Sequence, residues 1–501
     1  MKIYISIIIC FIVFSDDIIA QVELFSKTFS HGLRIVQTEL LHEDENYYYS
    51  MGYAEDSIGS ELGLHVAVHD KTNWDVVKFS YFELDSIWMF IGNSIRVIDI
   101  NDTLYFCANA GNKNYLMAYA KATGSLIIKR SMTNPLGGGT YTHDLRREKH
   151  RFLISYTAND DVKIVSPAIW IANDDGTDEI RYVDNSEKLI AAGKFVRMDN
   201  GNYLFLTTEL FNGEYRYKLN ISELDSNFNL LWIWSTPESD KAWVNSEVLP
   251  INDDEYMILY RAEKPTVIYQ NRAWPHSVMR FNIKTKKVVW KKDVASPVSL
   301  LESHIGGMVK SNIDSESFLV VTNVVGENST IDSFITKGRV LKINIDGKIV
   351  WQRDYAIFSN APITTNLFHN IISTYDGNYL IGGTAFNNQI MSWLVKVNEN
   401  GHIVGDTTSQ IDWVEANWKD KITIYPVPAN DILYINQDDI SEVEYELYDL
   451  SGKLVNQLAI DSENQSTGWD ISHLPDGNYI MLIKRNGKKI GTLKIILSGG
   501  R

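Results

Sequence analysis

The sequence predicts an all-β protein, in which a seven-bladed β-propeller is followed by a small C-terminal β-sandwich. The main observation is a unit of roughly 50–60 residues that recurs through the first 400 or so residues, a period typical of propeller blades with long loops. The last 80 or so residues instead carry short, closely spaced strand patterns. Aromatic residues make up 12% of the chain, which also favours strands, because flat rings pack well on a pleated surface.

Composition excludes some classes of function. The chain has 501 residues, which is too long for one ordinary core. Its formal net charge is −16 at pH 7, and an acidic surface repels phosphate backbones, so we expect no nucleic-acid partner. The two cysteines are Cys10 and Cys107. Removal of the N-terminal segment would leave only Cys107, so we expect no intrachain disulfide and interpret Cys107 as a buried strand residue.

The N-terminus has the pattern of an export signal. Residues 3–14 follow Lys2 and form an apolar run that is too short to span a bilayer. The small residue Ala20 predicts cleavage before Gln21, and therefore a signal peptide over residues 1–20. A lipoprotein signal that uses Cys10 is the alternative, although the apolar run continues beyond it. No other stretch reaches 18 apolar residues, so we expect no transmembrane segment in the mature chain.

Each repeat has the same order of signals. An acidic or Gly-containing turn comes first, then a strand that opens on a large apolar residue, and then two strands joined by a tight turn such as 344–347. The strand-opening residues are Tyr47, Leu104, Phe152, Tyr203, Tyr256, Phe318 and Tyr379. We therefore predict a propeller body over residues 21–415, in which residues 22–36 supply the outer strand of the last blade. Such closure buries every blade between two neighbours.

The body shows no established catalytic or metal-binding motif. H-E-x-x-H, G-x-S-x-G, the P-loop and paired C-x-x-C are all absent from the sequence. The recurring Asp-Gly and Asn-Gly pairs are interpreted as hairpin turns, because these residues tolerate positive φ, and the calcium-loop pattern is missing. We therefore expect no metal and no cofactor.

A weaker pattern involves histidines that precede strand openings. The candidate catalytic residues are His143, Asp144, His304 and His369. In a propeller such segments tend to lie near one mouth of the central channel, where histidine can act as a general base or a metal ligand. The arrangement weakly resembles the His-bearing blades of arylsulfotransferase-like propellers. The alternative is that these side chains stabilise turns, and their unequal spacing from the following strand favours that interpretation.

Two long loops, 261–277 and 323–338, are candidate contact surfaces. The first holds the candidate binding residues Tyr269, Arg272, Trp274 and His276. Aromatic residues beside Arg on a loop suit contact with carbohydrate or protein. Tryptophans also recur at equivalent repeat positions, and we interpret them as packing between blades rather than as sugar platforms. They are Trp170, Trp232, Trp234, Trp290, Trp351 and Trp393.

After a linker at residues 416–421 the pattern changes, and residues 422–501 read as a separate domain of about seven short strands. The segments IYPVPANDIL, YELYDLSGKLV and ISHLPDGNYIMLI follow one another in this order. Their motif residues are Tyr425, Pro426, Pro428, Asp449, Gly452, Lys453, Gly477 and Tyr479. Residues 422–497 resemble the type A C-terminal sorting domain of the type IX secretion system in Bacteroidota. One departure is Val427, where that family usually has Asn.

The resemblance implies a route and a location. A protein with such a domain passes the outer membrane through the type IX secretion machinery, which is then a partner, and is released or attached to the cell surface. For the body we predict a non-enzymatic module that binds glycan or protein. The alternative is a propeller hydrolase or arylsulfotransferase-like enzyme that uses the histidines at the channel mouth, and a display scaffold is a third possibility.

Overall fold

The computed structural model describes most of the chain after residue 25, and every regular element in the described part is a β-strand. The described ranges are 26–55, 62–83, 89–90, 96–160, 165–183, 189–210, 217–237, 242–262, 264–265, 272–273, 276–294, 306–325, 334–357, 363–386, 389–404, 422–426, 429–437, 443–449, 453–460, 466–485 and 488–498. Several predictions therefore lie outside the described residues: the signal peptide, the linker, Tyr269, Trp274, His304, Pro428 and Gly452. None of the described elements is a helix long and apolar enough to cross a membrane.

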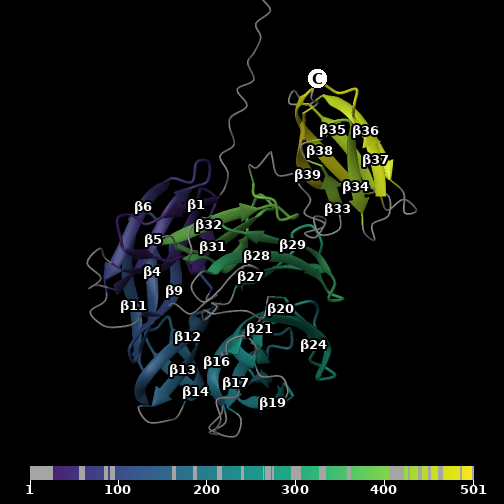
Figure 1. Ribbon diagram of the computed structural model, residues 1–501. Helices are drawn as coiled ribbons and strands as arrows, with labels where there is room; N and C mark the ends of the chain where they lie inside the picture. The colour runs from purple at the N-terminus through teal and green to yellow at the C-terminus, as the bar shows by residue number, and fades with distance from the viewer. Residues whose placement is uncertain are drawn as a thin grey trace, which may run out of the picture.

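The body consists of antiparallel units, most of them four-stranded, that follow one another along the chain (Figure 1). Unit 1 contains β3 (Leu40–Glu43), β4 (Tyr47–Glu55), β5 (Leu62–Asp70) and β6 (Val76–Glu83). Unit 2 contains β7 (Met89–Phe90), β8 (Ile98–Ile100), β9 (Thr103–Ala110), β10 (Lys113–Ala120) and β11 (Ser125–Thr133). Unit 3 contains β12 (Gly137–Glu148), β13 (Arg151–Asp160), β14 (Val165–Asn173) and β15 (Asp178–Tyr182).

The second half of the body repeats this plan. Unit 4 contains β16 (Leu189–Arg197), β17 (Tyr203–Leu210), β18 (Tyr217–Leu224) and β19 (Leu230–Ser235). Unit 5 contains β20 (Ala242–Pro250), β21 (Glu255–Ala262), β24 (His276–Asn282) and β25 (Lys287–Asp293), with the short pair β22 (Lys264–Pro265) and β23 (Arg272–Ala273) between β21 and β24. Unit 6 contains β26 (Met308–Lys310), β27 (Ser317–Val325), β28 (Phe334–Asn344) and β29 (Ile349–Tyr355). Unit 7 contains β30 (Ile363–Ser373), β31 (Tyr379–Phe386) and β32 (Ile390–Val397), and its fourth strand is β1 (Ser26–Phe29).

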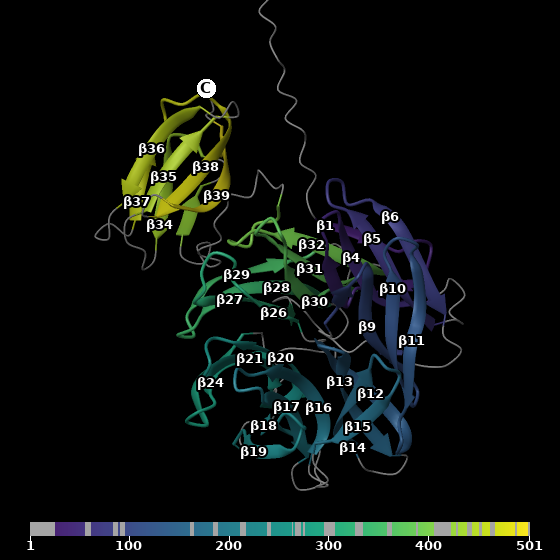
Figure 2. The ribbon, with the colours of Figure 1, turned by 180° about the vertical axis from the view of Figure 1, so that it is seen from behind.

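The first strands of successive units contact one another in a closed sequence. β8 contacts β12, β12 contacts β16, and the contacts continue through β20, β26 and β30 to β3. His42 of β3 and Asp99 of β8 complete the circuit through a hydrogen bond of 3.0 Å between Nε2 and Oδ2. The short strand β2 (Ile35–Val36) pairs with both β32 and β4 and so joins unit 7 to unit 1. The body is therefore propeller-like, as the front and back views show (Figures 1 and 2).

The N-terminal strand lies where the sequence places the closing strand. β1 pairs antiparallel with β32, and its register sets Ser26 opposite Val395 and Phe29 opposite Ser392. The indole Nε1 of Trp393 also donates a hydrogen bond of 3.1 Å to the Ser26 hydroxyl. The prediction that residues 22–36 supply the outer strand of the last unit is thereby confirmed for residues 26–29. The two ends of the body are held in one sheet, which removes two open strand edges.

The strand-opening residues predicted from the repeat are also confirmed. Each is the first or second residue of its strand, namely β4, β9, β13, β17, β21, β27 or β31, and all are buried except Tyr47, which is partly exposed. A further repeated contact joins neighbouring units at their outer strands. The Nε1 of Trp290 donates to the Ile345 carbonyl at 2.6 Å, and that of Trp351 donates to the Glu399 carbonyl at 3.2 Å. For these two tryptophans, packing between units is confirmed.

The turn at Gly401 offers a test of this contact. Gly401 has φ of +74°, and a Cβ added there would lie 2.6 Å from the indole of Trp351. We expect Gly401→Ala to lower the free energy of unfolding by about 2–4 kcal/mol, from backbone strain and overpacking together. The matched control is Gly377→Ala, because Gly377 has φ of +80° but nothing within 4 Å of an added Cβ. Urea denaturation should show a smaller loss for the control, and equal losses would contradict the role of Trp351.

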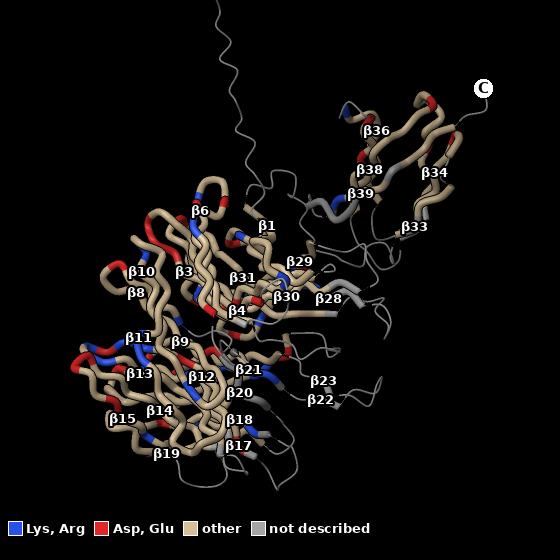
Figure 3. The backbone as a smooth tube through the Cα atoms, turned by 90° about the vertical axis from the view of Figure 1, so that its left-hand side faces the viewer, with Lys and Arg blue, Asp and Glu red and all other residues tan. Residues whose placement is uncertain are grey.

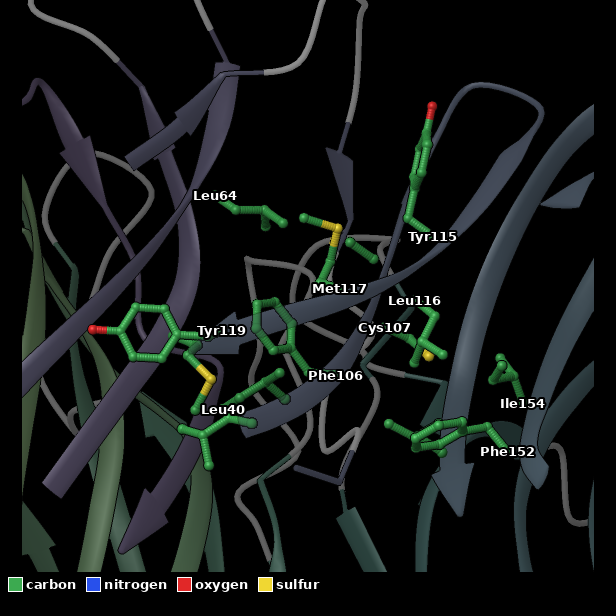
Figure 4. Close-up of a cluster of buried hydrophobic side chains, with 14 of the residues drawn as sticks. Leu40, Leu64, Phe106, Cys107, Tyr115, Leu116, Met117, Tyr119, Phe152 and Ile154 are labelled. Atoms are coloured by element: carbon green, nitrogen blue, oxygen red, sulfur yellow. The ribbon is translucent and has the colours of Figure 1, made fainter. Parts of the chain in front are cut away.

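The cores of units 1, 2 and 3 merge into one apolar cluster (Figure 4). Leu64 of β5, Phe106 of β9 and Ile154 of β13 are all fully buried in it. Cys107 lies in the same cluster, and burial raises the pKa of its thiol well above the usual value. The interpretation of Cys107 as a buried strand residue is therefore confirmed.

The C-terminal domain has its own core and consists of two sheets. One contains β33 (Ile422–Tyr425), β34 (Ile432–Gln437) and β37 (Ser466–Asp470), and the other contains β35 (Val443–Tyr448), β36 (Leu454–Ile460), β38 (Gly477–Arg485) and β39 (Lys488–Leu497). Leu433 of the first sheet and Tyr445 and Met481 of the second are fully buried in one cluster. The described strands number seven, as the sequence predicts.

Candidate functional site at the centre of the body

Five charged side chains meet where the first strands of four units come together. We call them the central charged cluster, and they are Arg96, Asp144, Arg146, Lys194 and Glu247. Arg96 lies two residues before β8, Asp144 and Arg146 lie on β12, and Lys194 and Glu247 lie on β16 and β20. The cluster therefore exists only because units 2, 3, 4 and 5 are neighbours in the ring.

Irregularities in the first strands set the direction of these side chains. The register of β12 against β13 shifts between Thr142 and Asp144, and β16, β20 and β30 shift at corresponding places. A bulge leaves the extra residue unpaired and re-aims the side chains beside it. After three of these bulges, the side chain accepts a hydrogen bond from the next backbone N–H: Asp144 at 3.0 Å, Glu247 at 3.2 Å and Asn370 at 2.8 Å. The three positions are therefore structurally equivalent.

The two carboxylates of the cluster are shared among three cations. Asp144 lies 3.8 Å from Nε of Arg96, 3.4 Å from Nε of Arg146 and 3.6 Å from Nζ of Lys194. Glu247 lies 2.9 Å from Nη2 of Arg96 and 3.6 Å from Nζ of Lys194. The Asp144 carboxylate also accepts the backbone N–H of Phe195 at 3.3 Å. The cluster thus carries one positive charge more than it has carboxylates to balance.

The charge imbalance of the cluster is energetically unfavourable because part of the cluster is buried. The Asp144 side chain is fully buried and that of Lys194 is 2% exposed, whereas those of Arg96 and Arg146 are 27% and 18% exposed. Burial alone would raise the pKa of Asp144, but the neighbouring cations hold it below its usual value. Burial lowers the pKa of Lys194, and burial together with repulsion from Arg96 lowers that of Arg146 to about 10. Within the described part of the chain, Nζ of Lys194 and Nε and Nη2 of Arg146 have no hydrogen-bond partner.

His143 lies in the bulge of β12, next to the cluster. Its Nε2 is 2.7 Å from the hydroxyl of Thr157, and that hydroxyl accepts the backbone N–H of Ala192 at 2.9 Å. Burial, and then repulsion from Lys194, lower the pKa of His143 to about 3. The imidazole is therefore neutral near pH 7 and shares one hydrogen bond with the Thr157 hydroxyl.

The other described residues of the predicted site do not take part in the ion pairs of the central charged cluster. His369 occupies the corresponding bulge of β30 in unit 7 and is 1% exposed. His276 is 1% exposed and lies at the start of β24, where its Nδ1 hydrogen-bonds the Thr322 hydroxyl of unit 6. Burial, followed by the charge of Arg261, lowers the pKa of His276 to about 3. Arg272 begins the short strand β23. The structure thus brings His143 and Asp144 to the central charged cluster, and places His276 in the packing between units.

Sequence reasoning missed Arg96, Arg146, Lys194 and Glu247. A signal for two of them was present, because Lys194 and Glu247 each lie nine residues before a strand-opening tyrosine, Tyr203 or Tyr256. Asp144 lies eight residues before Phe152. Alignment of the repeats at an offset of eight or nine residues would have shown that one structural position carries Asp, Lys and Glu in units 3, 4 and 5.

The described residues of the sorting motif form turns and an exposed aromatic pair. The rings of Tyr425 and Tyr434 stack with their centroids 5.7 Å apart, beside a cis peptide bond between Tyr425 and Pro426. Asp449 accepts the backbone N–H of Lys453 at 3.0 Å and so closes the turn between β35 and β36. The Tyr479 hydroxyl donates to the Pro475 carbonyl at 2.7 Å, in the turn where Gly477 begins β38.

Comparison with protein families identifies the C-terminal domain. Residues 423–498 match the family described as the secretion system C-terminal sorting domain. This match confirms the resemblance seen in the motif residues, and such a tail indicates a secreted or cell-surface protein. No curated protein matches the chain.

Several solved structures are similar to the chain at low identity. One is Drosophila Semaphorin 2a, with 9% identity, a TM-score of 0.45, and coverage of 95% of this chain and 98% of that chain. Another is the polysaccharide lyase Uly1, with 9% identity, a TM-score of 0.43, and coverage of 72% and 90%. A third is a subtype N11 neuraminidase-like protein of A/flat-faced bat/Peru/033/2010, with 10% identity, a TM-score of 0.35, and coverage of 74% and 93%. At these scores the similarities carry no argument about function.

Proposed function

We propose that residues 26–404 form a seven-bladed β-propeller that binds an acidic saccharide at the central charged cluster. In this proposal, residues 422–501 form a β-sandwich that directs the chain through the type IX secretion machinery. The observation that carries the binding proposal is the surplus of cations over carboxylates in the central charged cluster, where Lys194 and Asp144 are buried and Arg96 and Arg146 are partly exposed. The match of residues 423–498 to a sorting domain supports the export.

The unsatisfied donors of the cluster favour an anionic ligand. A buried cation without hydrogen bonds destabilises a protein by several kcal/mol in general. Nζ of Lys194 and two nitrogens of Arg146 are in this position within the described residues. A carboxylate or sulfate oxygen would satisfy these donors and balance the surplus charge. The whole chain carries a formal charge of −16, so this positive centre is opposite in sign to the rest of the molecule.

The depth of the cluster favours a slender ligand group over the surface of another protein. Asp144 and Lys194 are almost completely buried, whereas Arg96 and Arg146 retain some exposure and offer the approach. The guanidinium of Arg146 lies 5.3 Å from the centre of the Phe195 ring, which holds it in one orientation. A single charged substituent on a sugar fits this arrangement.

The geometry around His143 favours binding over catalysis. A general base must be within hydrogen-bond reach of the proton that it removes. The Nε2 of His143 is instead hydrogen-bonded to the Thr157 hydroxyl. That hydroxyl also accepts a hydrogen bond from the backbone N–H of Ala192 in the neighbouring unit. In this proposal His143 positions β16 and does not react with the ligand.

Isothermal titration with acidic and neutral oligosaccharides tests the proposal. We expect the mature protein to bind a uronate-bearing or sulfated oligosaccharide, with affinity that falls as salt screens the charges. Arg146→Gln should weaken binding about tenfold or more, because a charge-assisted hydrogen bond is lost. The control is Arg181→Gln, since Arg181 is 51% exposed and pairs with Glu179 on the outer strand β15. Equal affinity for neutral sugars, or equal binding by the Arg146 variant, would refute the proposal.

A further inference from the structure

A second cationic site lies at the β12–β13 hairpin, where β12 ends. A cavity of about 260 Å³ opens there between units 3 and 4. It is lined by Glu148, Lys149, His150, Arg151, Asn173 and Arg197. We call it the hairpin pocket. Glu148 lies four residues after Asp144 on the same strand, so the pocket is roughly 13 Å from the central charged cluster.

The charges of the hairpin pocket do not balance. Glu148 is the only carboxylate in its lining, against the cations of Lys149, Arg151 and Arg197. The Glu148 oxygens are already engaged, because the Tyr203 hydroxyl donates to Oε1 at 2.6 Å and Arg151 donates to Oε2 at 3.0 Å. Nε of Arg197 is 3.8 Å from Oε1, which is too far for a hydrogen bond. With one carboxylate against three cations, the lining keeps a surplus of two positive charges.

A neighbouring carboxylate, Asp174, does not remove this surplus. Arg147 binds Asp174 through two hydrogen bonds of 2.7 and 2.5 Å, and Nδ1 of His150 lies 3.7 Å from the same carboxylate. The Asn173 amide donates to the Thr177 hydroxyl at 3.1 Å. Asp174 is thus neutralised by Arg147, which leaves the guanidinium of Arg197 and the ammonium of Lys149 available on a side open to solvent.

Most of the basic residues of the pocket come from one short segment. Residues 145–151 read LRREKHR, so five of the seven residues are basic or histidine in a chain whose net charge is −16. Figure 3 shows blue segments, which are Lys or Arg, near the labels of β12 and β13. The hairpin turns at Lys149 with φ of 42°, and this sharp turn sets Lys149 and His150 at its tip. The guanidinium of Arg151 lies 5.8 Å from the centre of the Phe228 ring of unit 4. Packing therefore orients this side chain at the pocket.

We propose that the hairpin pocket binds an oxyanion group, namely a carboxylate, sulfate or phosphate carried by a small molecule or a saccharide. Arg197 and Arg151 present planar guanidinium donors that suit such groups, and Lys149 adds a point charge. This site is independent of the proposed function, because it shares no side chain with the central charged cluster. If an acidic saccharide chain carried two charged groups about 13 Å apart, it would contact both sites along β12.

The experiment uses the mature full-length chain and three probes: sodium sulfate, sodium phosphate and sodium glucuronate. Calorimetric titration should show saturable binding of at least one probe that weakens with sodium chloride. Arg197→Gln should reduce its affinity about tenfold, through the loss of a charge-assisted hydrogen bond. Arg181→Gln is the matched surface control and should bind as the wild type does. The same probes can also bind at the central charged cluster, so Arg146→Gln should leave unchanged the binding event that Arg197→Gln weakens and should affect only a second, separate event, which distinguishes the two sites.

The probes also identify the source of the oxyanion. Binding of glucuronate alone supports a uronate, whereas binding of sulfate or phosphate supports an ester of the corresponding acid. Arg197 is 54% exposed, so its replacement should leave the thermal midpoint almost unchanged, and any loss of affinity is then not a folding defect. The proposal is overturned if no probe binds saturably, or if the wild type and Arg197→Gln bind with the same affinity.

Discussion

Asp144→Asn should lower the free energy of unfolding by about 3–5 kcal/mol, the usual cost of removing one partner from a buried ion pair. The asparagine would leave Arg96, Arg146 and Lys194 facing Glu247 as the one remaining carboxylate of the cluster. Urea denaturation of the mature protein at pH 7 measures the change. The control is Glu179→Gln, which removes the exposed partner of Arg181 and should cost less than about 1 kcal/mol.

A double variant separates the loss of charge balance from a local packing defect. Lys194→Met in the Asp144→Asn background removes one uncompensated cation and fills the same space with an apolar chain. We expect it to recover part of the lost stability, so that the double variant is more stable than Asp144→Asn alone. Additive losses from the two substitutions would show that Asp144 and Lys194 do not interact, and would remove the electrostatic account of the cluster.

Acidification should destabilise the protein steeply between pH 6.5 and pH 5. Burial is the largest cause that lowers the pKa of four histidines to about 3: His65, His69, His143 and His276. In the unfolded chain a histidine titrates near 6.5. The folded state therefore stays neutral while the unfolded state takes up protons. The stability due to the neutral histidines is complete above about pH 6.5 and falls as the pH approaches 3.

One buried carboxyl opposes this trend. Burial raises the pKa of Glu39 to about 8, above the value of an unfolded glutamate, so Glu39 favours the folded state increasingly as the pH falls from 8. Four histidines against one glutamate leave a net uptake of roughly three protons on unfolding near pH 5.5. The free energy of unfolding should then fall by about 4 kcal/mol for each pH unit of acidification in this window.

Urea midpoints collected between pH 7.5 and pH 5 measure this dependence. His65→Leu should reduce the slope by about one proton, because His65 is fully buried. A stability that does not vary with pH over this range would mean that the buried histidines are solvated or charged in the folded protein.

The local features of the fold were predictable from the sequence because they depend on neighbouring residues. The strand-opening residues such as Tyr203 and Tyr379 follow turn signals within a few positions, and the structure places them at the start of their strands. The closing strand at residues 26–29 followed from the geometry of a ring, which requires a partner for the edge of β32. The sorting domain was recognisable because its motif order is contained in one continuous segment.

The candidate site was only partly predictable. His143 and Asp144 were found because they precede a strand opening, but Arg96 belongs to unit 2, whose first strand is divided into β7 and β8 and matches the repeat poorly. The hairpin pocket was missed for a different reason. Its basic run at 145–151 is visible in the sequence, but the contribution of Arg197 from β16 is not.

The sequence by itself determined that the chain is all-β, built from repeats and followed by a sorting domain, because alternation, turn residues and short motifs act over a few residues at a time. Only the tertiary structure decided which charges meet. Ring closure brings together side chains from units 2 to 5, and bulges in the first strands aim them toward the centre. Residues up to 151 positions apart, such as Arg96 and Glu247, form ion pairs there because electrostatic interaction depends on distance in space and on burial, neither of which is visible in the linear order.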